Sequence, residues 1–241
     1  DSCRAIIALR RTSPGVRSAS ARRAAAIYLG LVMVGEILLF AGLLLLARNA
    51  DSLLLRDAAI TLATADRQPL ILALLITAFG IKIGMLPLHV WLPLAHPAAP
   101  LPASAVLSGA MIKAGALGLL RLLPLGQVAV PGWSNRLLII GLLMAFCGVG
   151  AGLLQRRGKV LLAYSSISQM GFILLALGLG LGQPQSWPLL APAVLFYSLH
   201  HGLAKGTLFL GIGMAPARHR SALLRGVTAA GLVLPALALA G

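Results

Sequence analysis

The chain has 241 residues, of which 59% are hydrophobic and only 10% charged, and its mean hydropathy is +0.95. These values exclude an ordinary soluble globular domain and indicate a polytopic membrane protein. The formal net charge of +15 would fit a nucleic-acid-binding protein, but the basic residues flank the apolar runs and gather on one side of them, as the positive-inside rule describes. No nucleic-acid partner is therefore predicted.

Apolar runs long enough to cross a bilayer recur along the chain. A spanning helix needs about 20 apolar residues, and runs without strict alternation favour helices over a barrel. The sequence predicts an all-α bundle, one transmembrane domain over residues 1–241 with about six full spans and a truncated seventh. We expect a piece of a longer protein, because the chain opens without methionine and stops inside an apolar run. The predicted spans are 26–47, 69–88, 103–123, 136–154, 160–181 and 189–213, with a last run from 227.

The loops between the spans predict the orientation. Three segments rich in arginine and lysine, 4–23, 156–159 and 218–225, would lie on the cytoplasmic side. The opposite loops hold fewer basic residues, and three of these are offset by aspartates. Three tryptophans lie near predicted span ends, where tryptophan anchors a helix at the membrane interface. They are Trp91, Trp133 and Trp187.

Once the residues near the span ends are assigned to the loops, four charged residues remain with apolar sequence on both sides: Glu36, Lys82, Lys113 and Lys205. A lysine at the membrane centre costs about 2.5–3.5 kcal/mol on insertion scales, so such groups usually face a bundle interior and mark ion or proton pathways. Snorkelling to the interface is the alternative. An apolar environment disfavours a charged amine and a nearby carboxylate favours it, so a carboxylate that approached and withdrew would load and unload a lysine with a proton.

A proline follows the first of these lysines. In "FGIKIGMLPLHVWLPLAHPAAP", residues 79–100, Pro87 comes five residues after Lys82. Proline lacks a backbone donor and interrupts helices, and interrupted membrane helices are typical of transporter sites. The sequence therefore predicts a helix break near Pro87. The later prolines, at 93, 97, 100 and 102, are equally well explained as shaping a loop.

Polar residues share one face of the 189–213 span. Ser198, His201 and Lys205 are spaced i, i+3, i+7, and histidine can relay protons near neutral pH, so His201 is a candidate relay. His200 points away and suits packing or lipid contact.

In the 160–181 span, Tyr164 and Ser168, like Ser165 and Gln169, form i, i+4 pairs. They could carry water or join helices by hydrogen bonds. An intramembrane hydrolase built on these serines is disfavoured, because no acid or metal pair accompanies them.

Three stretches, in this order, resemble one family: "FGIKIGMLPLHVWLPLAHPAAPLPASAVLSGAMIKAGALGLLRLLP", "GKVLLAYSSISQMGFILLALGLG" and "LFYSLHHGLAKGTLFLGIG". They are similar to the antiporter-like proton-translocating subunits of respiratory complex I, membrane-bound hydrogenases, formate hydrogenlyase and multi-subunit cation/proton antiporters. The short sequences "AHPAAP" and "SGAMIK" within the first stretch are most similar to those of the hydrogenase-linked branch of this family.

The resemblance implies about fourteen helices in two inverted repeats, of which this chain would hold the end of the fifth to the start of the twelfth. It implies that Lys82 is the lysine of the broken seventh helix and Lys113 that of the eighth. His201 and Lys205 match the His-to-Lys pattern of the eleventh.

The resemblance also implies features outside the chain. The key glutamate of the fifth helix would precede Asp1, and the ionisable residue of the twelfth helix would follow Gly241. A fragment without both is not expected to pump alone. Glu36 falls on the sixth helix, where only some relatives carry an acid, and Leu94 stands where many have an aspartate.

The predicted function is a proton-translocating membrane subunit of a complex I-like or hydrogenase-linked oxidoreductase complex. Redox centres are expected in partner subunits, because the sequence has no cysteine cluster and no glycine-rich phosphate loop; no cofactor or metal is predicted here, and whether the chain counts as part of an enzyme depends on those partners. The alternative is a subunit of a multi-subunit cation/proton antiporter without a redox partner, and Na+ stays open as the ion. A structural or assembly subunit is the third reading. The composition, rich in alanine, leucine and arginine, suggests a bacterial inner membrane.

Overall fold

The computed structural model describes residues 19–52 and 54–214, and in this part the chain is helical without strands. The all-α prediction is thus confirmed. The last predicted span, from 227, and the basic segments 4–17 and 218–225 lie outside the described residues. The helices are α2 (Ala19–Ala47), α3 (Ala58–Thr64), α4 (Gln68–Ile83), α5 (Trp91–Ala98), α6 (Leu101–Val106), α7 (Ile112–Leu122), α8 (Pro131–Leu153), α9 (Gly158–Gly182) and α10 (Trp187–Met214), with short turns η1 (Leu88–Val90), η2 (Leu107–Met111) and η3 (Pro184–Ser186).

Five helical stretches of the described chain are long and apolar enough to cross a membrane. They coincide with the first five predicted spans, and α10 coincides with the sixth. Each begins before the predicted boundary, by one or two residues in most cases and by five to seven at Pro131 and Ala19, because a helix continues past the apolar core into the interfacial layer. The stretches are Ala19–Ala47, Gln68–Ala98, Leu101–Leu122, Pro131–Leu153 and Gly158–Gly182.

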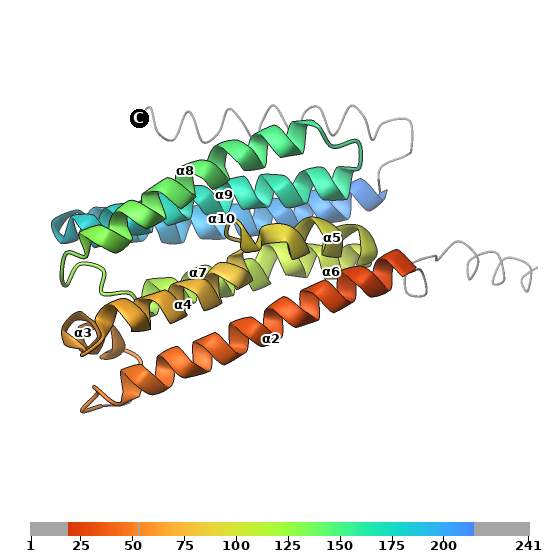
Figure 1. Ribbon diagram of the computed structural model, residues 1–241. Coiled ribbons are helices and arrows are strands. Elements are labelled where there is room, and N and C mark those ends of the chain that lie inside the picture. Colours follow the sequence, from red (N-terminus) through yellow and green to blue (C-terminus); the bar gives the residue numbers. More distant parts are fainter. Residues whose placement is uncertain (1–18, 53, 215–241) are drawn as a thin grey trace, which may run out of the picture.

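The long helices lie side by side along one direction (Figure 1). α8 and α9 form a hairpin packed along its whole length, α2 lies against α4 and α5, and α10 packs on α9 and α6. Glycines allow the α8–α9 contact: a Cβ atom at Gly171 would lie 2.6 Å from the Gly141 carbonyl oxygen, and one at Gly148 would lie 2.7 Å from the Ser168 backbone nitrogen. Small residues serve this purpose at membrane helix interfaces.

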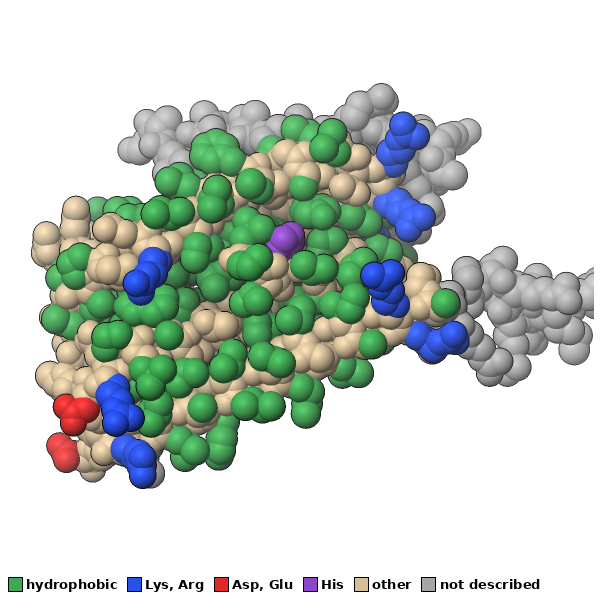
Figure 2. Space-filling view, in the orientation of Figure 1, with side chains coloured by type: hydrophobic (Ala, Val, Ile, Leu, Met, Phe, Trp, Pro, Cys, Tyr) green, Lys and Arg blue, Asp and Glu red, His purple; other side chains and the backbone are tan. Residues whose placement is uncertain are grey.

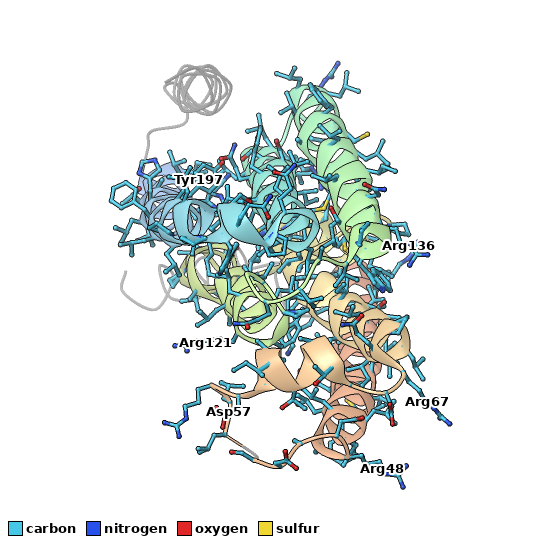
Figure 3. The ribbon with its side chains drawn as sticks, turned by 90° about the vertical axis from the view of Figure 1, so that its left-hand side faces the viewer. Arg48, Asp57, Arg67, Arg121, Arg136 and Tyr197 are labelled. Atoms are coloured by element: carbon cyan, nitrogen blue, oxygen red, sulfur yellow. The ribbon has the colours of Figure 1, made fainter. Side chains whose placement is uncertain are left out.

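Charged residues gather at the two ends of the bundle, and apolar side chains cover the face between them (Figure 2). Figure 3 looks onto one end, where Arg48, Arg67, Arg121 and Arg136 lie together with Asp57. These residues come from the loops predicted to lie opposite the cytoplasm. The α8–α9 turn and the start of α2 lie at the other end (Figure 1).

The predicted helix break near Pro87 is confirmed, but its cause lies earlier in the chain. α4 ends at Ile83, and Gly84 adopts the left-handed conformation with φ of 74°, which glycine reaches without steric cost. The Met85 N–H donates to the Gly80 carbonyl at 2.8 Å, which closes the helix end. Pro87 follows this cap and directly precedes η1. The proline therefore does not itself end α4.

The interfacial role predicted for Trp91 is wrong. Its side chain is 1% exposed, and its Nε1–H donates to the Ile81 carbonyl at 2.8 Å. The indole thus adds a second donor to a carbonyl in the last turn of α4, which also accepts from the Gly84 N–H at 3.2 Å. Trp133 and Trp187 stand at the starts of α8 and α10, as the prediction requires.

Candidate functional site

An ion pair joins Glu36 of α2 to Lys82 of α4. Glu36 lies 17 residues after the start of α2 and Lys82 lies 14 residues after the start of α4, so both stand about 20–25 Å from a helix end at 1.5 Å per residue. Glu36 therefore lies near the middle of α2, whereas Lys82 is the second-last residue of α4. The two helices are in contact here, since a Cβ atom at Gly35 would lie 3.6 Å from the Ala78 carbonyl oxygen, an ordinary van der Waals distance.

The helix break places Lys82 at the carboxyl end of α4. The last turn of a helix carries partial negative charge from its unpaired carbonyls, which favours a cation there. One carbonyl of this turn, that of Ile81, accepts from Trp91. Lys82 thus has the Glu36 carboxylate and the carbonyl end of α4 as its neighbours, and its side chain is 28% exposed.

Lys82 also touches the helix that carries the next lysine. A Cβ atom at Gly115 of α7 would lie 2.9 Å from the Lys82 Cβ, so glycine is needed for this contact. Gly115 stands two residues after Lys113. The first two lysines therefore belong to adjoining helices.

Lys113 follows a wide turn. Residues 107–111 form a π-helix between α6 and α7, and the Lys113 Nζ donates to the Ser108 backbone carbonyl at 2.5 Å. Such turns are frequent at functional sites. A cavity of about 480 Å³ opens between this turn and α10, with Lys113 and Ser198 among its lining residues.

Lys205 is buried in the bundle, with 4% of the residue exposed. Its Nζ donates to the Leu162 carbonyl at 3.1 Å and to the Ser165 hydroxyl, so α9 supplies both partners. His201, one turn earlier on α10, is 5% exposed, and neither ring nitrogen has a hydrogen-bond partner among the described residues. Lys113 and Lys205 are both near enough to act electrostatically on this ring.

Two serines connect Lys113 to Lys205. The hydroxyls of Ser108 and Ser166 lie 2.8 Å apart, and Ser166 donates to the Leu162 carbonyl at 3.0 Å. This is the carbonyl that accepts from Lys205. Ser108 and Ser166 thus link the surroundings of the two ammonium groups, and each ammonium donates to a backbone carbonyl at its end of the series.

The remaining polar residues of α9 and α10 join helices. Ser168 donates to the Ala145 carbonyl of α8 at 2.8 Å, and the Tyr197 hydroxyl donates to Gln169. His200 is exposed, as its position on the helix predicts. These contacts agree with the helix-packing role that was the alternative for this group.

Sequence reasoning missed Ser108, Ser166 and the acidic partner of Lys82. The serines carry no signal of their own, since serine is common in membrane helices as a packing residue. Glu36 was named as a candidate, but the pairing itself links residues 46 positions apart and depends on how α2 packs against α4.

Residues 13–240 match the family model described as "NADH:quinone oxidoreductase/Mrp antiporter, TM". The chain belongs to this family. It is a multi-pass membrane protein, and the resemblance drawn from the sequence motifs is confirmed.

Among curated relatives of this antiporter-like chain, hydrogenase-4 component B of Escherichia coli (strain K12) is 38% identical over 200 residues, which cover 80% of this chain and 30% of that protein. Formate hydrogenlyase subunit 3 of the same organism is 40% identical over 143 residues, covering 57% of this chain and 24% of that protein. The chain thus spans less than a third of the length of these relatives.

Solved structures share the fold of this antiporter-like chain. The Mrp complex from Dietzia sp. DQ12-45-1b contains a chain that superposes with a TM-score of 0.70 at 25% identity, covering 83% of this chain and 36% of that one. The membrane-bound sulfane sulfur reductase, an archaeal respiratory membrane complex, gives a TM-score of 0.67 at 27% identity, covering 82% and 40%.

Proposed function

We propose that this chain is the proton-translocating part of a membrane subunit in a complex I-like or hydrogenase-linked oxidoreductase complex. The observation that carries the proposal is the series of ionisable side chains along adjoining helices, from the partly exposed Glu36–Lys82 pair at the helix break to Lys113 and on to the buried Lys205. Ionisable groups in membrane helices are costly and are retained where protons or ions pass.

The Glu36–Lys82 pair supplies the loading step. While the carboxylate touches the ammonium, the charged amine is favoured, and withdrawal of the carboxylate leaves an amine in apolar surroundings that releases its proton. Lys82 lies against α7, so Lys113 is the next amine along the interior. From there the two serines and His201 lead to Lys205.

The energy source lies in other subunits. The proposed partners are the remaining membrane subunits and a redox module, and the chain itself needs no cofactor to move protons. The curated relatives are named as a hydrogenase component and a formate hydrogenlyase subunit, which favours a hydrogenase-linked complex in a bacterial inner membrane.

A cation/proton antiporter subunit without a redox partner is the second candidate. The likeness to a chain of the Mrp complex favours it. Both candidates use the same lysines, and they differ in what drives the proton: an oxidisable substrate in the first, a Na+ gradient in the second.

The test uses the full-length protein in its native complex, in inverted membrane vesicles with a pH-sensitive dye. We expect Lys82→Ala to slow proton translocation at least about tenfold, within the range of a lost proton-transfer group, while Arg121→Ala, which changes an exposed residue at the bundle end, keeps the parental rate. Unchanged translocation by an assembled Lys82→Ala complex would overturn the proposal in favour of a structural subunit. Energising the vesicles with a reduced substrate or with Na+ separates the two candidates.

A further inference from the structure

A groove runs between α2 and α5 near one end of the bundle, with a volume of about 340 Å³. Arg22 lines it near the start of α2, and Tyr28 and Leu107 line it farther inside. We refer to it as the α2–α5 groove. Its walls are formed by alanines, three on α2 and three on α5 or directly after it: Ala21, Ala24, Ala25, Ala95, Ala98 and Ala99.

The interior of the α2–α5 groove is apolar. Alanine side chains offer no hydrogen-bonding group, and the Tyr28 hydroxyl already donates to the Met111 sulfur at 3.5 Å. The Tyr28 ring also packs against Trp91, with ring centroids 5.3 Å apart. An empty groove loses the dispersion contacts of the atoms that line it. A hydrocarbon chain therefore fits this interior better than a polar ligand does.

The length of the groove fits a lipid better than a protein helix. Arg22 and Tyr28 are six residues apart on α2, which corresponds to about 9 Å along the helix axis. The boundary between headgroups and acyl chains is about 5–10 Å deep, so the groove leads from the headgroup layer to the hydrocarbon. A spanning helix of another subunit would contact it over fewer than about two turns.

The groove opens at an end of the bundle where the described residues are basic and none is acidic. The start of α2 and the α8–α9 turn both lie at this end (Figure 1), and the face shown in Figure 2 has Lys and Arg side chains there without Asp or Glu. At the opposite end, aspartates accompany the arginines. The basic residues at the groove end are Arg22, Arg23, Arg156, Arg157 and Lys159.

Two of these basic residues reach the groove itself. Arg22 lines it from α2, and Lys159 approaches it from α9, where its Nζ donates to the Ala99 carbonyl at 2.6 Å. An ammonium group has three donors, so this contact leaves donors for an anion. A guanidinium group binds phosphate through two parallel hydrogen bonds. Basic pockets between membrane helices on the cytoplasmic side bind anionic lipid headgroups.

We propose that the α2–α5 groove is a binding site for an anionic phospholipid of the cytoplasmic leaflet. Arg22 and Lys159 hold the phosphate, and one acyl chain lies between the alanines. The basic charge at the mouth selects an anionic lipid over a neutral one. The site contains none of the residues of the proposed proton path, so the failure of either proposal leaves the other open.

The test uses the full-length protein in its native complex, reconstituted with phospholipids that carry a photoactivatable group in one acyl chain. Phosphatidylglycerol is compared with phosphatidylcholine of the same chains, and cross-linked peptides are located by mass spectrometry. We expect phosphatidylglycerol to label the groove peptides about fivefold more than phosphatidylcholine. Arg22→Gln should remove most of this preference, while Arg121→Gln, at the opposite end (Figure 3), should keep it. Equal labelling by the two lipids in the parent would overturn the proposal.

A second pair of variants tests the place of the acyl chain. Ala25→Leu fills the groove, whereas Ala26→Leu adds the same bulk at an exposed position outside its lining. We expect Ala25→Leu to lower phosphatidylglycerol labelling of the groove to the level of phosphatidylcholine, and Ala26→Leu to keep the parental level. Parental labelling of α8, whose Phe146 is 74% exposed, shows that the variant complex is intact. Equal labelling in the two variants contradicts the site, as does a groove that neither lipid labels because another subunit covers it.

Discussion

The glycine at position 171 offers a direct test of how tightly α8 is held on α9. The substitution Gly171→Ala would place a Cβ atom 2.6 Å from the Gly141 carbonyl oxygen and 2.7 Å from the Ala145 nitrogen. Carbon–oxygen contacts between helices are normally about 3.3–3.6 Å. Both neighbours are backbone atoms, so no side chain can turn away, and the helices must separate by about 0.7 Å.

The cost follows from that separation. Overpacking of a tight interface costs about 1–3 kcal/mol, and the better helix propensity of alanine returns about 0.5–1 kcal/mol. A net loss of up to about 2.5 kcal/mol is expected in the free energy of unfolding. Since α9 is the main neighbour of α8, the loosened contact is not shared with other helices.

The assay is thermal or denaturant unfolding of the purified full-length protein in detergent, followed by circular dichroism. The matched control is Gly150→Ala on α8, where a Cβ atom would meet nothing within 4 Å, and we expect it to be neutral or slightly stabilising. If Gly171→Ala proves as stable as Gly150→Ala, the close packing of α8 on α9 is refuted.

Three other substitutions test the site. Trp91→Phe keeps a buried ring but removes one of the two hydrogen bonds to the Ile81 carbonyl, which still accepts from the Gly84 N–H, so we expect a loss of about 0.5–1.5 kcal/mol, measured in the same unfolding assay; an unchanged midpoint would argue against the capping role. Glu36→Gln keeps the size but removes the carboxylate that loads the lysine, and we expect vesicle proton translocation to fall at least about tenfold with assembly intact; a parental rate would remove Glu36 from the pathway. Ser166→Ala removes the link between the Ser108 and Ser166 hydroxyls, so translocation should slow, whereas Ser134→Ala, which removes a bond to a backbone carbonyl of α9 elsewhere, should keep the parental rate; equal effects would mean that the serines serve packing alone.

The spanning helices were predictable from the sequence because length and hydropathy alone decide them. The run from Pro131 to Leu153, for example, is apolar throughout and becomes a continuous helix. Helix ends were less predictable, since they depend on local conformation. The cap at Gly84 requires the left-handed backbone conformation. A glycine within an apolar run does not by itself predict that conformation.

The lysines and His201 were predictable because charge inside an apolar run is rare. Their partners were not predictable. The pairing of Glu36 with Lys82 depends on how α2 packs against α4, and the link from Ser108 to Ser166 joins residues 58 positions apart. Small hydroxyls and a buried histidine look alike in sequence whether they pack helices or carry protons, and only their neighbours distinguish the two roles.

The π-helix at Leu107–Met111 allows the two halves of one membrane span to pack against different helices. Before it, α6 packs on α10, and after it, α7 packs on α4. Each residue of an α-helix turns the chain by about 100°, so the extra residue of the wide turn shifts the phase of the downstream half against the upstream half. Deleting one residue within this turn would restore a regular helix and rotate the Lys113 side chain away from its present facing, while leaving the upstream half in place. The span thus consists of two helical segments that face different neighbours, and the π-helix between them sets their relative rotation.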